Sequence, residues 1–524
     1  MKISKKILSA GLVATSALAL ASCGGGGTST LSIFMYQEGF VYNEDMVVFQ
    51  KANEYAGVEL EGFLDTYITN YDSVYNLNAA KINLVVNDQD TIEATALQDG
   101  IFADLTDLIA EHAPNLTAYW EKNPEHKEWA KASDGKIYGI PFYTDGKTAK
   151  AFFVRQDWVD KLAQAGKLPS GIDKSNLDAL TVVQFEALLK AFKDNPTVVT
   201  DGKIKKSSDI IPYFDRDSDF AISELASLWG ATGDLYVDEN GKVHHGAIEE
   251  SFKVAANNIA RWAKAGLIDS QIIIKGTDDK RETYFMTNVG GATHDWIGTT
   301  YSFNDDVYEL AMPKDFQLVS ILPPERADGT RFEPTVRKQI GKVTAINQLV
   351  TSEEDQIKLV KWIDWFFSPE GHEAVNFGIE GEHFTKTGDS YAYTDKILND
   401  NNTALVNLYN TGAQMQGPGA QTFAYESAWL SEEANAAMAK YEQYLNPRYN
   451  DLIFPNIKVE KVDYKTINET KSAVATVYSQ ALASWFNKGS VSDGDWNAFV
   501  NSMKNAGVEN LVAVMQKYVD AKKA

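Results

Sequence analysis

The chain has 524 residues, too many for one hydrophobic core, so we expect at least two lobes. Its formal net charge of −23, with no basic stripe, excludes a nucleic-acid-binding surface, because phosphate recognition needs clustered lysine and arginine. A single cysteine excludes an internal disulfide framework and a cysteine-based zinc site. Aromatic residues make up 11% of the chain, which leaves room for rings that serve a ligand rather than the core.

Residues 1–22 have the features of an export signal. Lys2, Lys5 and Lys6 give it a basic start, and residues 7–21 are mostly apolar but too few to span a bilayer. We therefore treat this segment as a signal peptide and exclude it from the folded protein.

The only cysteine, Cys23, directly follows Leu20, Ala21 and Ser22, and this run resembles the bacterial lipobox. The resemblance implies cleavage before Cys23, diacylglycerol on its sulfur, and an extracytoplasmic protein that is lipid-anchored to the cell membrane. Residues 23–30, rich in glycine, then form a flexible tether. An ordinary secretory signal with an incidental cysteine is the alternative.

Strand and helix patterns alternate after the tether, which favours α/β layers over a β-sandwich. We expect Thr181 to cap a helix, Gly266 to end one, and Asn240-Gly241 to supply the positive φ angles of a hairpin turn. The expected strands are 31–36, 81–87, 135–144, 150–155 and 341–348, with a hairpin at 236–245; the expected helices are 43–56, 91–98, 105–111, 156–165, 181–193, 221–229, 251–265, 352–367, 432–444, 471–487 and 493–520.

Several motifs follow one another along the chain. They are Gly100–Thr106 (GIFADLT), Asp134–Pro141 (DGKIYGIP), Phe153–Leu162 (FVRQDWVDKL), Tyr284–Met286 leading to Gly290 and Trp296, and Trp362–Gly371 (WIDWFFSPEG) with Asn376–Gly381 (NFGIEG). Their order and spacing, together with the lipobox, resemble the extracellular solute-binding lipoproteins of bacterial ABC importers. The resemblance is to the carbohydrate-binding members related to maltose-binding proteins, and in the last motifs to the long-chain, LplA-like subgroup.

The resemblance implies an α/β, two-lobed periplasmic-binding-protein-like fold of type II, whose lobes are joined by hinge crossovers around a ligand cleft. By segment order, residues 28–148 and 320–385 would form lobe one, and residues 149–319 and 386–524 lobe two. The implied function is non-catalytic. A monomer captures a carbohydrate in the cleft and delivers it to the permease subunits of an ABC importer, and the long, aromatic-rich chain favours an oligosaccharide.

Sugar recognition needs aromatic faces for the C–H patches of the ring and planar polar groups for its hydroxyls. Ligands of open α/β sheets bind at the carboxyl ends of strands. The family places a stacking aromatic at Trp296, and Asp88 corresponds in position to a ligand-binding acid of maltose-binding relatives. The further candidates are Tyr36, Glu38, Asn87, Tyr143, Trp229, His294, Asp295, Glu380 and His383.

Five of these further candidates have a structural alternative. Tyr36 would otherwise be a packed strand end, His294 and Asp295 would serve turn chemistry, and Glu380 and His383 would make local loop hydrogen bonds. By contrast, Trp158, Trp262 and Trp362 sit at helical spacing among apolar residues, and we expect them in the core.

We expect no cofactor, with structural calcium as an open alternative. The DRDSD stretch at 215–219 begins like a calcium loop but has Phe220 and Ala226 where glycine and glutamate belong. Relatives often carry an Asp-rich calcium loop after the helix that here ends near Lys193, and residues 194–200 depart from that pattern.

An enzyme is the second class of function that we weigh. The 72 aspartate and glutamate residues could include the acid–base pair of a glycoside hydrolase, although no G-x-S-x-G, phosphate-binding loop or H-E-x-x-H motif occurs. The two hypotheses are a sugar-capturing lipoprotein and a surface-tethered enzyme that acts on a glycan. Within the binding class, a peptide or another small solute is the alternative ligand.

Overall fold

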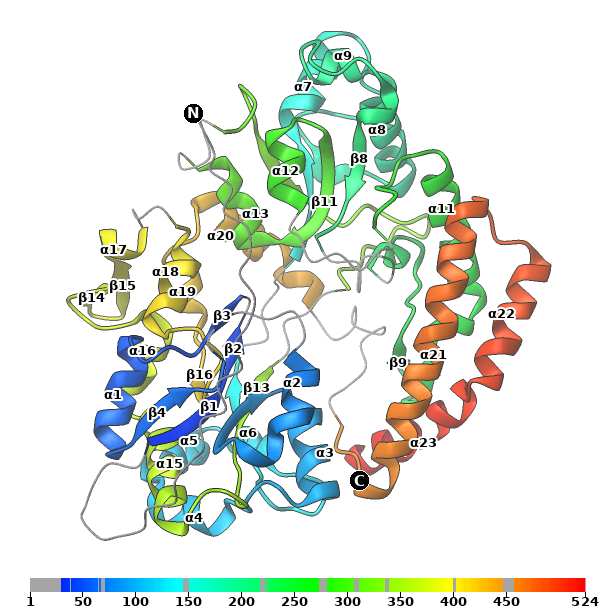
Figure 1. Ribbon diagram of the computed structural model, residues 1–524. Helices are drawn as coiled ribbons and strands as arrows, with labels where there is room; N and C mark the ends of the chain where they lie inside the picture. The colour runs from blue at the N-terminus through cyan, green and yellow to red at the C-terminus, as the bar shows by residue number, and fades with distance from the viewer. Residues whose placement is uncertain are drawn as a thin grey trace, which may run out of the picture.

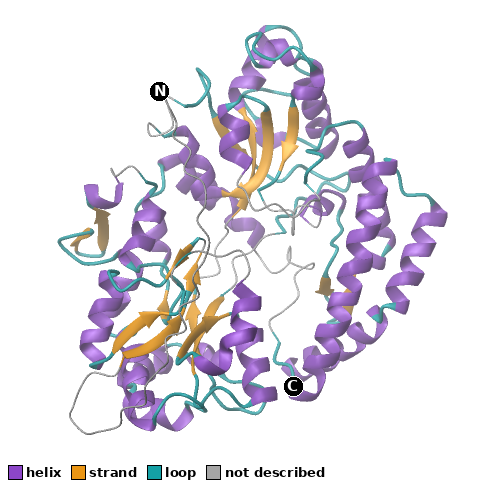
Figure 2. Cartoon of the chain, in the orientation of Figure 1, coloured by secondary structure: helices purple, strands orange, loops and turns teal. Residues whose placement is uncertain are grey.

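The computed structural model describes residues 30–523, except for 38, 65, 67–70, 145–149, 217–221, 223, 273–279, 306–310, 335–338, 399–401 and 446–456. The described chain forms two α/β lobes, each built on its own sheet (Figure 1). Figure 2 shows the strands of each sheet enclosed by helices. The α/β class and the two lobes therefore agree with expectation.

The first lobe contains a six-stranded sheet in the order β16-β6-β13-β5-β1-β4. Its strands are β1 (Thr30–Phe34), β4 (Glu59–Gly62), β5 (Leu84–Asn87), β6 (Ile140–Tyr143), β13 (Ile340–Ile346) and β16 (Gly419–Ala420). β1 pairs in parallel with β4 and β5, whereas β13 is antiparallel to both of its neighbours, β5 and β6. Alternate side chains of β5 enter two separate cores, with Leu84 and Val86 on one face and Val85 on the other.

Helices cover both faces of the first sheet. α2 and α3 pack on the face of Val85, and the larger core on the opposite face contains Trp362, which is fully buried as expected. The helices of this lobe are α1 (Val47–Ala56), α2 (Tyr71–Asn78), α3 (Gln89–Asp99), α4 (Thr106–His112), α5 (Pro114–Lys122), α6 (Pro124–Ala130), α15 (Glu353–Trp365), α16 (Pro369–Phe377), α17 (Asp395–Leu398), α18 (Ala404–Thr411) and α19 (Phe423–Ser427), with short strand pairs β2 (Tyr36–Gln37) and β3 (Phe40–Val41), and β14 (Phe384–Thr387) and β15 (Ser390–Tyr393).

The second lobe contains a four-stranded sheet in the order β12-β7-β11-β8. β7 (Lys150–Arg155) has the bounds that the sequence predicts and is antiparallel to β12 (Leu318–Ile321) and β11 (Gly290–Trp296), while β8 (Ile211–Phe214) is parallel to β11. Its helices are α7 (Gln156–Gln164), α8 (Val182–Asp194), α9 (Pro196–Val199), α11 (Glu250–Lys264), α12 (Lys280–Met286), α13 (Ile297–Tyr301) and α20 (Glu432–Tyr441), with the hairpin β9 (Leu235–Val237) and β10 (Val243–His245). Trp158 and Trp262 are fully buried, which confirms their expected place in the core.

The sheet pairing differs from the expected lobe boundaries. Residues 386–524 were expected in lobe two, yet Ala420 pairs with Tyr143 in the first sheet, and α18 and α19 pack into the core of the first lobe. The boundary at 319/320 also divides β12, whose four residues all pair with β7 of the second sheet. The two-residue strand β16 is too short to leave a pattern in the sequence, which is why the third crossover was placed too early.

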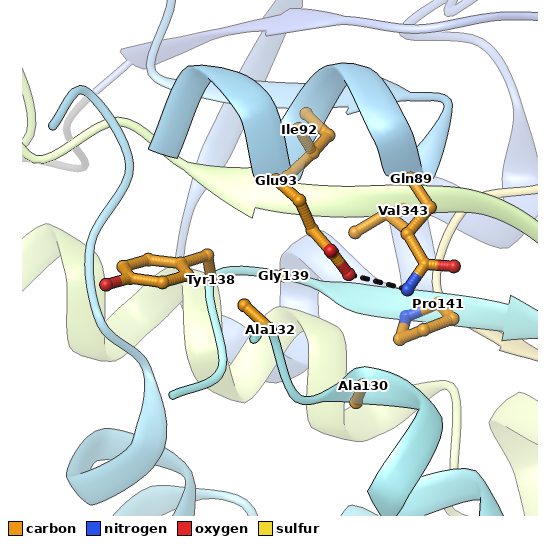
Figure 3. Close-up of a pocket in the computed structure, with 9 residues that line it drawn as sticks. All are labelled: Gln89, Ile92, Glu93, Ala130, Ala132, Tyr138, Gly139, Pro141 and Val343. Atoms are coloured by element: carbon orange, nitrogen blue, oxygen red, sulfur yellow. Dashed lines mark hydrogen bonds between the residues drawn. The ribbon is translucent and has the colours of Figure 1, made fainter. Parts of the chain in front are cut away.

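Three C-terminal helices connect the two lobes at one side. They are α21 (Lys461–Lys488), α22 (Asp493–Asn505) and α23 (Val508–Lys523). α21 packs along α11 of the second lobe, and at its other end Tyr464 donates a hydrogen bond of 3.2 Å to Glu93 of α3 in the first lobe. Figure 3 shows Glu93 turned toward Gln89 at a small cavity below α3. The expected helix 493–520 is in fact two helices, which separate at Gly507 with φ of 95°.

The helix cap, the helix end and the hairpin turn that the sequence predicts are mostly confirmed. Thr181 accepts a hydrogen bond from the backbone N–H of Gln184 in a full capping box, and Gly266 follows α11 with φ of 66°. In the β9–β10 turn only Gly241 has positive φ, because Asp238 accepts hydrogen bonds from the following backbone and leaves Asn240 in an ordinary conformation. None of the helices in the described ranges combines the length and apolar character that a bilayer span requires.

Candidate functional site

The carboxyl end of β11 is directed toward the first lobe, and Trp296 is its last residue (Figure 1). Trp296 is partly exposed, and its backbone N–H donates a hydrogen bond to Oδ1 of Asp295 at 2.7 Å. Trp296 lies opposite Lys150 in the sheet register, and the Lys150 Nζ is 5.8 Å from the centroid of the indole ring. An aromatic ring is thus held at a strand end, where α/β proteins bind their ligands.

His294, two residues earlier on β11, is completely buried between two carboxylates. Its Nδ1 is 2.7 Å from Oε2 of Glu224, and its Nε2 is 3.0 Å from Oε2 of Glu333. Ionised carboxylates only accept hydrogen bonds, so both ring nitrogens must donate and the ring is an imidazolium. Burial alone would lower the pKa of His294, but the charges of Glu333 and Glu224 and their hydrogen bonds outweigh it and raise this pKa to about 10.

Glu224 joins this histidine to Lys150. The Lys150 Nζ is 2.6 Å from Oε1 of Glu224, and both side chains are nearly inaccessible to solvent. Burial would raise the pKa of Glu224, but His294 and Lys150 together lower it to about 2. Asp215, just after β8, is also buried, and desolvation together with the charge of Glu224 raises its pKa well above the usual range.

Asp295 holds two arginines. Its Oδ1 is 2.9 Å from Nη2 of Arg216, and its Oδ2 is 3.1 Å from Nε of Arg281. Asp295 is buried, while the Arg216 side chain is 25% exposed. We call this group of eight ionisable residues the floor network; its members are Lys150, Asp215, Arg216, Glu224, Arg281, His294, Asp295 and Glu333.

The floor network also includes a residue of a segment in which the chain crosses from one lobe to the other. Glu333 lies in the segment after β12 that returns the chain to β13 of the first sheet, and it is fully buried against His294. Sequence reasoning selected His294 and Asp295 as ligand-facing candidates, whereas their side chains are buried in ion pairs. It missed Lys150, Glu224 and Glu333, which carry no motif and are far apart in the chain.

Asp88 and Asn87 lie at the carboxyl end of β5 in the first lobe. Asp88 is exposed, and its carboxylate makes no capping hydrogen bond to α3, which it precedes. Asn87 is buried, and its Oδ1 accepts a hydrogen bond from the Asp88 backbone N–H at 2.8 Å. Tyr36, at the start of β2, is partly buried, and the ammonium of Lys342 lies 3.3 Å from the centroid of its ring.

Of two further aromatic candidates, Tyr143 is buried in a core and Trp229 packs against one. Tyr143 is 1% exposed, stacks on His126 with ring centroids 4.4 Å apart, and accepts a hydrogen bond from the indole of Trp120. Trp229 is partly buried and packs edge-on against Trp262 at 5.1 Å. Their apolar neighbours, which sequence order does not reveal, explain why both rings turn inward.

The remaining candidates lie elsewhere in the chain. Nδ1 of His383 accepts a hydrogen bond from the backbone N–H of Ile379, so His383 makes the local loop contact that we weighed as its alternative. Glu380 is exposed in the same loop. Glu38 and Cys23 fall outside the described residues.

Carboxylates that could suggest a cation site are already engaged. Ligand atoms of Asp215, Glu224 and His294 lie within 4.8 Å of one another. His294, however, donates with both nitrogens, and Glu224 already binds Lys150, so a metal ion would meet two positive charges instead of free ligands. This donor set does not fit a metal ion.

The segment after α8, where relatives often carry a calcium loop and this sequence departs from the pattern, also has its carboxylates in ion pairs. Asp194 binds Lys190 at 2.6 Å, and Asp201 binds Lys161 at 2.8 Å. Calcium needs several oxygens that converge on one point, and these two carboxylates face lysines instead. Both aspartates of this segment therefore take part in ion pairs in this structure.

Sequence and structure comparisons cover nearly the whole chain. No family model matches. The chain is 24% identical over 518 residues to the fructooligosaccharide ABC transporter substrate-binding protein FusA of Streptococcus pneumoniae, with 91% of this chain and 87% of that protein covered. Among solved structures it resembles the alginate-binding protein AlgQ2 (TM-score 0.78, 26% identity, 94% and 98% of the two chains) and FusA in complex with kestose (TM-score 0.73, 19% identity, 94% and 99%).

The chain is a homologue of the substrate-binding proteins of ABC transporters. The expected two-lobed fold of these proteins is confirmed by the structural matches. Such proteins are non-catalytic, so this homology, and not the lack of a motif, decides against the enzyme hypothesis. It also implies a location outside the cytoplasm.

The charge state of His294 gives the first prediction. Its folded-state pKa of about 10 lies above the ordinary value of 6.5, so the stabilisation from its protonation is complete below pH 6.5 and is lost as the pH rises through 10. The imidazole NMR signals of His294 should therefore remain those of the protonated form at neutral pH.

His126 serves as the internal control, because burial lowers its pKa. Its ring should be neutral under the same conditions. Titration of His294 near its ordinary pKa would contradict the imidazolium assignment.

Proposed function

We propose that this protein captures an oligosaccharide between its lobes and delivers it to the permease of an ABC importer. The observation that carries the proposal is the similarity to FusA over 91% of the chain, together with a partly exposed tryptophan at the end of β11. FusA is named for fructooligosaccharides and AlgQ2 for alginate, which are both carbohydrates. A peptide or another small solute is not favoured by either relative.

The proposed site lies between the strand ends of the two sheets. Trp296 supplies an aromatic face from the second lobe, and Asp88 supplies an exposed carboxylate from the first. Rings bind the apolar patches of a sugar and carboxylates accept hydrogen bonds from its hydroxyls, so the two residues offer complementary contacts. A ligand that touches both lobes stabilises a closed arrangement over an open one, and closure is the signal that a permease can recognise.

We further propose that the mature protein begins at Cys23 and is held to the membrane by acyl chains on this residue as a monomer. The support is the basic start, the apolar stretch and the small residues before the cysteine. The glycine-rich tether would let the lobes stand away from the bilayer.

The non-catalytic role gives the second prediction. Incubation with a panel of oligosaccharides should raise the melting temperature for at least one class of glycan, because ligand binding to the folded state stabilises it. The sugars should be recovered unchanged. Release of reducing ends would support a glycan-active enzyme, and stabilisation by peptides alone would move the ligand to another class.

The stacking role of Trp296 gives the third prediction. Trp296→Ala should weaken binding of the identified sugar by about 1–3 kcal/mol, by analogy with aromatic stacking on nucleobases, as measured by calorimetry. Trp296→Phe keeps a ring and should recover part of the loss. Unchanged affinity in a variant with the wild-type melting temperature would remove Trp296 from the site.

The lipid anchor gives the fourth prediction. Expressed in a bacterial host, Cys23→Ala should release the protein from the membrane fraction, whereas the wild-type protein should stay there and label with a fatty-acid analogue. A Ser22→Ala variant keeps the thiol and should behave as the wild type. Membrane retention of the Cys23→Ala variant would contradict acylation at this residue.

A further inference from the structure

The two relatives are named for ligands of different charge, since fructooligosaccharides are neutral and alginate is a polymer of uronates. Overall similarity does not decide between these classes for this chain. The floor network next to Trp296 does bear on the choice, because an anionic sugar needs cations that are free to bind it.

In the described part of the second lobe, the two cations beside Trp296 and Asp295 are bound to carboxylates of the same lobe. Lys150, the neighbour of Trp296 in the sheet, is 2.6 Å from Glu224. Arg216 uses both Nε and Nη2 on the carboxylate of Asp295 and also donates from Nη2 to the hydroxyl of Thr299 at 2.8 Å. The two nitrogens with which an arginine binds a carboxylate in a bidentate manner are thus already occupied by Asp295.

A ligand carboxylate would have to displace one of these partners. Asp295 is 1% exposed and also binds Arg281, so it cannot turn away into solvent without leaving a buried charge unpaired. Removing one partner from a buried ion pair leaves a charge without compensation, and a single surface contact with a ligand does not offset that cost. Sugar hydroxyls make no such demand, because they accept hydrogen bonds from an arginine that remains paired.

The carboxyl end of β5, in the first lobe, carries exposed negative charge. Asp88 follows β5, and Asp90 lies in the first turn of α3; both are exposed. Carboxylates at the rim of a site repel an approaching anion, and the formal charge of the whole chain, −23, has the same effect over a longer range.

We propose that Asp295 and Glu224 determine the specificity of this protein by serving as built-in counter-ions for Arg216 and Lys150, so that the site selects neutral over anionic oligosaccharides. The inference rests on the proposed function and deepens it by naming the class of sugar. Asp295 and Glu224 act through the cations that they hold, and they are therefore positioning residues.

The test compares neutral fructo- and gluco-oligosaccharides with alginate oligosaccharides of matched length on the wild-type protein by calorimetry. A neutral sugar should bind at least about a hundredfold more tightly than any uronate, which corresponds to about 2.7 kcal/mol. Its affinity should change little with salt, because no net charge is neutralised on binding. Tighter binding of the uronates would overturn the selectivity while leaving sugar capture intact; binding of neither class would overturn the proposed function itself.

Two variants test which residues set the selectivity. Asp295→Asn should release Arg216 and raise the affinity for uronates at least about tenfold, in a salt-dependent manner. Glu224→Gln should do the same through Lys150 and covers the case in which the first variant does not fold. Glu325→Gln is the matched control, because it also removes the carboxylate partner of an arginine, Arg331, outside the floor network. Unchanged preference in both folded variants, or an equal gain in the control, would contradict the assigned role.

Discussion

The contact of His294 with Glu224 and Glu333 joins the parts of the second lobe that must keep their positions. It connects β11, which carries Trp296, to the segment that returns the chain to the first sheet. A buried imidazolium between two carboxylates is costly to break, because loss of one partner leaves a charge without compensation. These ion pairs therefore fix the strand end to the crossover.

Rigid lobes are useful to a protein that binds by closure. If the floor network rearranged on ligand binding, part of the binding free energy would offset the cost of that rearrangement. Less of it would then stabilise the closed arrangement of the lobes. In this protein Lys150, His294 and Asp295, near Trp296, are each held in ion pairs, and the indole beside them is partly exposed. The C-terminal helices provide a second link between the lobes, through Tyr464 and Glu93, on the side of α3. The proposed closure has to be compatible with both this link and the crossovers.

Sequence patterns predicted the parts of the fold that depend on neighbouring residues. The bounds of β7 and the cap at Thr181 follow from a buried apolar run and a capping box, both of which are local signals. β16 was missed because a strand of two residues has no periodicity, and its pairing with β6 depends on residues far away in the chain. Periodicity likewise placed Trp158 in the core, whereas nothing in the sequence showed that Tyr143 stacks on His126.

The candidate site, too, was predicted only in part from the sequence. Trp296 was selected because the resembled family places a stacking aromatic at this point, and Asp88 because it ends an expected strand and corresponds in position to a ligand-binding acid of that family. The structure leaves both at least partly exposed. His294 and Asp295 were selected as sequence neighbours of Trp296, but their partners come from distant segments that only the folded chain brings together. The most direct test of the account is a crystal structure with a neutral oligosaccharide bound. It should show the sugar in contact with Trp296 and Asp88, with His294 still between Glu224 and Glu333. A sugar bound away from these strand ends, or a floor network broken by the ligand, would contradict it.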